Sequence, residues 1–218
     1  MKYEIIPPDT WDRKVKLDYY KDFDMPYIIM TAEVDVTNVV HFAHKNEVSF
    51  NLCMVYLCNE VADSILHFRY RMIDGKPCLV AYNQPEINHI FPGEEEFVMS
   101  YGAWPNDSII RFCRETYQRF EDAAAGRAPE SRYADHTGVI NYTAIPWVHY
   151  SQMFRTIKKG GGDTNPKISF GKYMEKDGHY MMPVSVQVHH TLMDGYHVGQ
   201  FYIKLEQSIQ ELAINPRT

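Results

Sequence analysis

The sequence has few cysteines, no long apolar run and no excess of positive charge, and each of these excludes a class of protein. Its four cysteines form no CxxC pair and lie in apolar segments, so they are predicted to be free core thiols in a reducing compartment. Nowhere do about 18 apolar residues follow one another, and the start MKYEIIPPDTW has no apolar stretch, so neither a membrane span nor a signal peptide is indicated. The net charge of −6 disfavours nucleic acid and anionic membranes as partners. A cytoplasmic protein is expected.

The residues that are present predict one globular domain over residues 1–218. A hydrophobic content of 45% over 218 residues is enough for a sizeable core, and no repeat or low-complexity tract divides the chain. One segment, residues 155–177, is locally basic, with six lysines and arginines against three acidic residues. That segment carries +3 and the remainder −9, so it is the candidate surface for an anionic partner.

Hydrophobic periodicity predicts helices interspersed with many strands. Thr10 is the candidate cap of a helix through Tyr20. A second helix, which begins SFNLCMVYLC, is apolar nearly all round and should be buried. Strands are expected at 27–36, 78–82, 87–91, 97–104 and 139–147, a third helix at 106–125, a hairpin at 167–190 turning at 176–178, and a closing helix after it. The pattern indicates an α/β layered fold.

The stretch SVQVHHTLMDGYHVGQF places several residues that can act in catalysis, three histidines and an aspartate, at the end of a predicted strand. Alternation along the strand places His190 on the face of the preceding valines and His189 on the other face, so the ring of His190 is desolvated and neutral. The alternatives are a hydrogen-bonded core histidine, an ordinary N-cap at Asp194 and a first-turn helix residue at His197. A metal site is disfavoured, because the adjacent histidines point apart and no cysteine lies nearby.

Three segments resemble one known family. QVHHTLMDGYHVGQF is similar to the HHxxxDG signature of the chloramphenicol acetyltransferases, a signature shared with the catalytic domain of dihydrolipoyl acyltransferases. NYTAIPWV, residues 141–148, is similar to their asparagine, hydroxyl and proline-tryptophan segment, and WDRKVKLDYY, residues 11–20, resembles their N-terminal helix. Weaker similarity extends over nearly the whole chain in the same order. The resemblance implies a two-layer α/β sandwich of a mixed sheet with helices.

The resemblance also implies acetyl transfer from acetyl-CoA, as co-substrate, to a hydroxyl, without a metal. His190 Nε2 matches the general base, and in the family the other ring nitrogen is held by the histidine's own backbone carbonyl. Thr143 stands where relatives carry serine and would donate a hydrogen bond to the oxyanion. Asp194 would pair with Arg13 and so organise the turn that carries the base.

Further residues match the family's binding positions. Trp147, Tyr173 and Lys172 match positions near coenzyme A. The acceptor positions are matched by Tyr20, Phe97, Met99 and Asn141, whereas the loop 127–138 matches poorly. The family assembles as a homotrimer with active sites between subunits. Two alternatives to chloramphenicol acetylation stay open: the same chemistry on another hydroxylated small molecule, and a non-catalytic relative that only binds a ligand.

Overall fold

The computed structural model describes residues 3–127, 137–158 and 162–214. Its core is a mixed sheet in the order β2-β10-β8-β7-β5-β6, with β9 paired to β10. Strands β5, β7 and β8 run parallel, whereas the other pairings are antiparallel. A smaller sheet has the order β1-β4-β3. The strands are β1 (Tyr3–Ile5), β2 (Tyr27–Asp35), β3 (Tyr70–Ile73), β4 (Lys76–Val80), β5 (Gln84–His89), β6 (Val98–Tyr101), β7 (Val139–Ala144), β8 (Lys167–Phe170), β9 (Met174–Lys176) and β10 (His179–His189).

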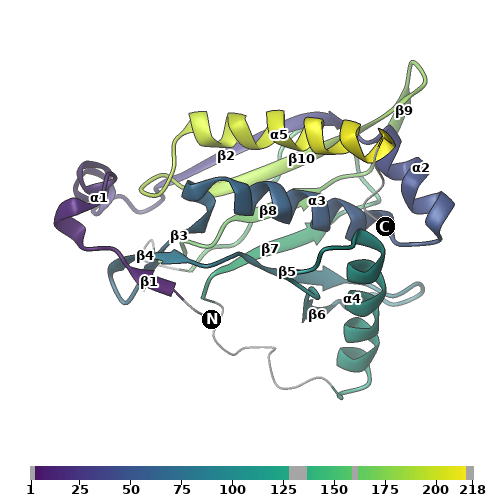
Figure 1. Cartoon of the computed structure of the whole chain (residues 1–218), viewed down its shortest axis with the longest axis horizontal. Coiled ribbons are helices and arrows are strands. Elements are labelled where there is room, and N and C mark those ends of the chain that lie inside the picture. The colour runs from purple at the N-terminus through teal and green to yellow at the C-terminus, as the bar shows by residue number, and fades with distance from the viewer. Residues whose placement is uncertain (1–2, 128–136, 159–161, 215–218) are drawn as a thin grey trace.

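Helices α2, α3, α4 and α5 pack against one face of the larger sheet, with the apolar core between the two layers, whereas α1 lies apart at one end of the molecule (Figure 1). The helices are α1 (Lys14–Tyr20), α2 (Thr37–Asn46), α3 (Phe50–Ser64), α4 (Ile109–Ala124) and α5 (Gly195–Ile214). The predicted two-layer α/β architecture is therefore confirmed. In the part of the chain that is described, no helix is both long and apolar enough to cross a membrane.

Strand β10 shows how alternation sorts side chains between the two faces. Val184 and Val186 are fully buried in the core beneath the helices. Ser185 and Gln187 point to the opposite face, where a segment without regular structure covers them: the Met153 backbone N–H donates to Ser185 Oγ at 3.3 Å, and that of Arg155 donates to Gln187 Oε1 at 2.8 Å. The buried side chains of Ser185 and Gln187 thus accept hydrogen bonds from backbone N–H groups of the covering segment, as buried polar groups require.

Two local features differ from the sequence-based predictions. The first helix begins at Lys14 and not after Thr10, because the Thr10 hydroxyl donates to the Pro7 carbonyl and the chain stays in a 3-10 turn there. The helix α2 was not predicted, although its buried Val39, Phe42 and Ala43 follow the helical spacing.

The hairpin turn and the cysteines agree with expectation. The β9–β10 hairpin turns at Asp177 and Gly178, both with positive φ, which suits a two-residue turn. All four cysteines are free and buried.

Candidate active site

The turn after β10 is held by a buried arginine. The guanidinium of Arg13 lies just before α1 and donates to both carboxylate oxygens of Asp194, at 2.5 and 3.2 Å. It also donates to the backbone carbonyls of Thr191 at 3.0 Å and His190 at 2.9 Å. Arg13 is only 6% exposed, and its hydrogen bonds keep the pKa of the Asp194 carboxyl below its usual value. The predicted contact between Arg13 and Asp194 is therefore present, and it fixes the turn at three points.

The ring of His190 is oriented through Nδ1. This atom lies 3.2 Å from the Met193 carbonyl oxygen, with which it is hydrogen-bonded, and 3.3 Å from Asp194 Oδ1. The expectation that its own backbone carbonyl holds the ring is wrong: Nδ1 is hydrogen-bonded to the Met193 carbonyl, and the His190 carbonyl accepts from Arg13. The ring of Tyr20 stacks on the imidazole with centroids 4.6 Å apart. The Asp194 carboxylate thus contacts both the Arg13 guanidinium and the His190 imidazole. A residue that only organised the turn would not need to lie so close to the ring.

The neighbouring His189 has different surroundings. It is buried, its Nδ1 accepts the Thr191 backbone N–H at 3.3 Å, and its ring meets that of Tyr27 edge-on at 5.1 Å. The two histidines therefore have different contacts, as strand alternation predicted. His190 itself lies in the turn after β10 and its side chain is 29% exposed, so the expected desolvation of its ring by the apolar face of the strand is wrong. Within the described ranges, no three His, Cys, Asp or Glu side chains are grouped so as to hold a metal ion.

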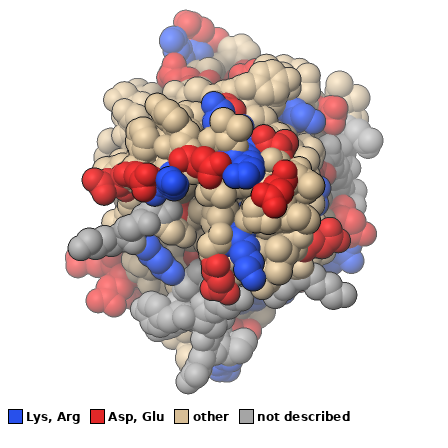
Figure 2. Space-filling view, turned by 90° about the vertical axis from the view of Figure 1, so that its left-hand side faces the viewer, with Lys and Arg blue, Asp and Glu red and all other residues tan. Residues whose placement is uncertain are grey.

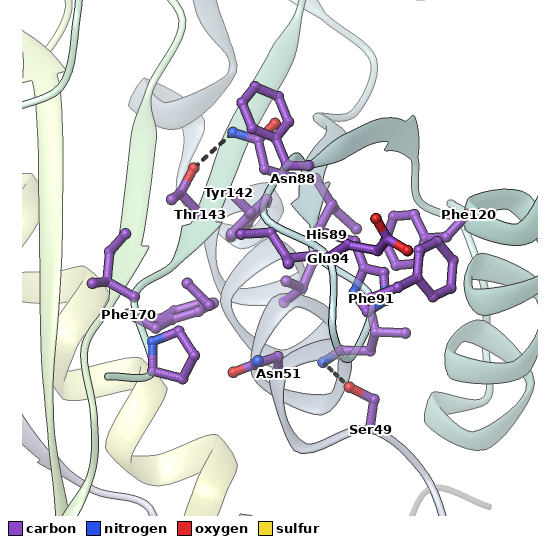
Figure 3. Close-up of a pocket in the computed structure, with 18 of the residues that line it drawn as sticks. Ser49, Asn51, Asn88, His89, Phe91, Glu94, Phe120, Tyr142, Thr143 and Phe170 are labelled. Atoms are coloured by element: carbon purple, nitrogen blue, oxygen red, sulfur yellow. Dashed lines mark hydrogen bonds between the residues drawn. The ribbon is translucent and has the colours of Figure 1, made fainter. Parts of the chain in front are cut away.

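A second group of candidate residues surrounds a cavity of about 550 Å³ (Figure 3). The cavity lies where the parallel strands β5 and β7 end, facing the start of α3. Its volume falls in the range of small-molecule sites, which are roughly 300–1,000 Å³. Its walls are mainly apolar and aromatic, and its lining includes Asn88, His89, Phe97, Thr143 and Trp147.

Thr143 presents its hydroxyl at this cavity and is bound by a residue that sequence reasoning missed. Asn88 Nδ2 donates to Thr143 Oγ1 at 3.1 Å, and the two side chains point toward each other in Figure 3. The available signal was the polar pair Asn88 and His89 inside the strand INHIF. His89 was also missed; its ring lines the cavity and stacks on Phe120 at 4.5 Å, and burial lowers its pKa.

The predicted coenzyme A residues lie beside the cavity. Trp147 lines it and is 63% exposed. The Lys172 backbone N–H donates to the carbonyl of Val148, the residue after that tryptophan. Tyr173 meets the ring of Phe50, the first residue of α3, edge-on at 5.1 Å. Of the three residues, Trp147 lines the cavity, and Lys172 and Tyr173 contact residues that are adjacent in sequence to its lining.

The predicted acceptor residues divide between the two groups. Tyr20 lies with His190. Phe97 lines the cavity, and Met99 is the cross-strand neighbour of Asn88. Residues 128–136 of the poorly matching loop lie outside the described ranges.

The locally basic segment is less positive at the surface than its composition suggests. Lys167 is buried and pairs with Asp163 at 2.7 Å. Arg155 donates to the backbone carbonyl of Asn141 at 2.9 Å, and the side-chain amide of Asn141 donates to Glu86. Predicted as an acceptor contact, Asn141 is thus engaged in this network and is not among the residues lining the cavity. On the face that carries α1, acidic and basic side chains are interspersed (Figure 2).

The register of the sheet separates the two groups within one chain. Thr143 is paired with Ser169, and Ser169 with Ser185, five residues before His190 on β10. Five residues along a strand and two strand spacings across the sheet correspond to roughly 19 Å between the backbones of Thr143 and His190. A single chain therefore does not bring these two side chains to one reacting atom.

Solved structures of acyltransferases share this fold. A chloramphenicol acetyltransferase structure superimposes with a TM-score of 0.83 at 25% identity, covering 95% of this chain and 100% of that one. A probable dihydrolipoamide acetyltransferase from Listeria monocytogenes shares the fold, with a TM-score of 0.70, 13% identity and coverage of 98% and 97%.

The sequence assigns the chain within that class. The profile of the family "Chloramphenicol acetyltransferase" matches residues 1–206. The chloramphenicol acetyltransferase of Clostridium perfringens is 25% identical over 223 residues, covering all of this chain and 98% of that protein. The chain belongs to the chloramphenicol acetyltransferase family and is an acyltransferase.

Proposed function

We propose that the protein transfers acetyl from acetyl-CoA to a hydroxyl group of chloramphenicol or a similar small molecule, with His190 as general base. The observation that carries this proposal is the orientation of His190 through Nδ1 by Met193 and Asp194. A neutral imidazole that donates through Nδ1 has its lone pair on Nε2, which is the atom that can take a proton. Family membership supplies the reaction class.

The chemistry follows from that tautomer. Nε2 of His190 removes the proton of the acceptor hydroxyl, and the oxygen attacks the carbonyl carbon of the thioester. The tetrahedral oxyanion then collapses, the carbon–sulfur bond breaks, and the departing thiolate takes the proton from the imidazolium. The products are an acetyl ester and free coenzyme A. Arg13 and Asp194 act by holding the ring, and Asp194 also stabilises the transient positive charge on it.

Thr143 is the proposed donor to the oxyanion. Because Asn88 donates to Thr143 Oγ1, one lone pair of that oxygen is occupied and the O–H proton can be directed at a ligand. The cavity beside it, with Trp147 in its lining, is of a size to take the pantetheine arm of acetyl-CoA, and Tyr173 and Lys172 are the other proposed coenzyme residues. Phe97, Met99 and Tyr20 are the proposed acceptor-binding residues.

The site is proposed to form between copies of the chain in a homotrimer. In one chain, the strand geometry places the backbone of His190 roughly 19 Å from that of Thr143. Tyr20 lies with His190, and the cavity lies with Thr143. Closed symmetric assembly joins one surface of each copy to a different surface of the next, which can bring the two groups together.

We expect the protein to release free thiol from acetyl-CoA when a suitable hydroxylated acceptor is present. The measurement is a thiol-release assay over a panel of hydroxylated small molecules that includes chloramphenicol. Release with chloramphenicol supports the primary assignment, and release only with another acceptor supports the same chemistry on a different substrate. Binding of acetyl-CoA without thiol release from any acceptor would contradict the proposed activity.

The hydroxyl of Thr143 gives a second test. Thr143→Ala should lower kcat by about 10²-fold, which is the usual effect of losing one oxyanion donor. Thr143→Ser keeps the hydroxyl that Asn88 orients and should stay close to the wild type. Equal damage from both substitutions would mean that the methyl group, through packing, matters instead of the hydroxyl.

A further inference from the structure

His197 takes part in a helix cap at the turn that carries the proposed base. Helix α5 begins at Gly195, and the Asp194 carbonyl accepts the backbone N–H groups of His197 at 3.0 Å and Val198 at 3.4 Å. In the reverse direction, His197 Nδ1 accepts the backbone N–H of Asp194 at 2.9 Å. The bond from the Asp194 N–H is one half of a capping box: the third helical residue reaches back to the N-cap N–H, with an imidazole in place of the usual Glu or Gln, while the N-cap side chain binds Arg13 and does not return the bond.

The cap matters because the side chain of Asp194 is engaged elsewhere. An N-cap aspartate ordinarily accepts a backbone N–H of the first helical turn. Here its two carboxylate oxygens accept from Arg13, and one of them lies 3.3 Å from His190 Nδ1. The His197 ring therefore holds the backbone of Asp194, and the carboxylate of Asp194 faces the proposed base.

The surroundings of His197 keep its ring neutral and in place. The ring stacks on His67 with centroids 3.6 Å apart, and His67 Nε2 lies 3.8 Å from Asp12 Oδ2. Burial, followed by the positive charge of Arg13, lowers the pKa of His197, while Asp194 and Asp12 oppose that shift. Burial and the neighbouring His197 lower the pKa of His67 to about 4. Both rings are thus uncharged at neutral pH, and Nδ1 of His197 can accept.

We infer that His197 is a positioning residue for acetyl transfer: by capping the Asp194 N–H it sets the carboxylate that orients His190. The inference rests on the function proposed above. His197 acts through Asp194, so its loss should change the rate of the chemical step and leave acetyl-CoA binding largely intact. The same acceptor could be supplied by a glutamine side chain.

A matched pair of substitutions tests the cap through catalysis. His197→Phe keeps a ring to stack on His67 but removes the acceptor, and His197→Gln keeps an acceptor. His197→Phe should lower kcat on the order of 10²-fold, since a displacement of about 1 Å can cost that much, with KM for acetyl-CoA within about twofold. His197→Gln should retain kcat within about fivefold. Asp194→Ala serves as the reference for complete loss of the oriented carboxylate. Unchanged kcat in the Phe variant, or equal losses in both, would overturn the inference.

A second measurement does not depend on activity. In histidine-labelled wild-type protein at neutral pH, nitrogen NMR should show His197 with Nδ1 unprotonated and Nε2 protonated, with the Gln variant used to assign its signals. Amide hydrogen exchange at Asp194 should rise in His197→Phe and stay slow in His197→Gln. A protonated Nδ1, or equal exchange in both variants, would refute the cap even in an active enzyme. If the NMR and exchange results hold but the wild type releases no thiol with any acceptor, the proposed function fails and the cap stands.

Discussion

His190→Ala should lower kcat for acetyl transfer by about 10²–10⁴-fold, the usual contribution of a positioned general base. The affinity for acetyl-CoA should be nearly unchanged, because His190 is proposed to act on the acceptor hydroxyl, whereas the coenzyme is assigned to other residues, Trp147, Lys172 and Tyr173. Thiol release gives the rate, and calorimetric titration gives the affinity.

His189→Asn is the matched control. Asparagine keeps an acceptor near the position of Nδ1 for the Thr191 N–H, so the turn can keep its hydrogen bond while the ring is lost. This variant should remain far more active than His190→Ala. If it proves the more damaging of the two, His189 and not His190 acts on the substrate.

Mixing two inactive variants should restore activity. In trimers that contain both His190→Ala and Thr143→Ala chains, one of the three interfaces combines an intact His190 with an intact Thr143, so about one third of the wild-type activity is expected for closed cyclic assembly. Co-expression with two different affinity tags and tandem purification isolates such hybrids, and the thiol-release assay measures them.

Each variant alone, purified in the same way with both tags, is the control. Activity of the hybrids equal to the mean of the two parents would place base and oxyanion donor in one chain, against the register of the sheet. A particle mass that is not three times the chain mass would contradict the trimer by itself.

Local pattern predicted the parts of the site that depend on strand alternation. The repeat of Val184, Val186 and Val188 predicted that His189 and His190 point apart, and their different contacts agree. The first helix was misplaced, because the competition between a Thr10 cap and its hydrogen bond to Pro7 is decided by a few local atoms that periodicity does not describe.

The contact between Arg13 and Asp194 was predicted only from the family resemblance. The two residues are 181 positions apart, and no periodicity connects them. The acceptor for His190 Nδ1 was assigned incorrectly for a related reason: which of two carbonyl groups, that of His190 or that of Met193, meets Nδ1 depends on the geometry of the turn.

The sequence alone determined the class of fold and the types of residue available for chemistry, because hydrophobic periodicity and short motifs are local properties of the chain. Only the tertiary structure decided that Asn88 binds the hydroxyl of Thr143, that His197 caps Asp194, and that Thr143 and His190 are held apart. Each of these depends on the register between strands or on the geometry of one turn. The contact of Asn88 with Thr143 and the separation of Thr143 from His190 arise from packing between distant segments, which a pattern of neighbouring residues does not encode. The cap of Asp194 by His197 is local, but it depends on the conformation of the turn, which periodicity does not describe.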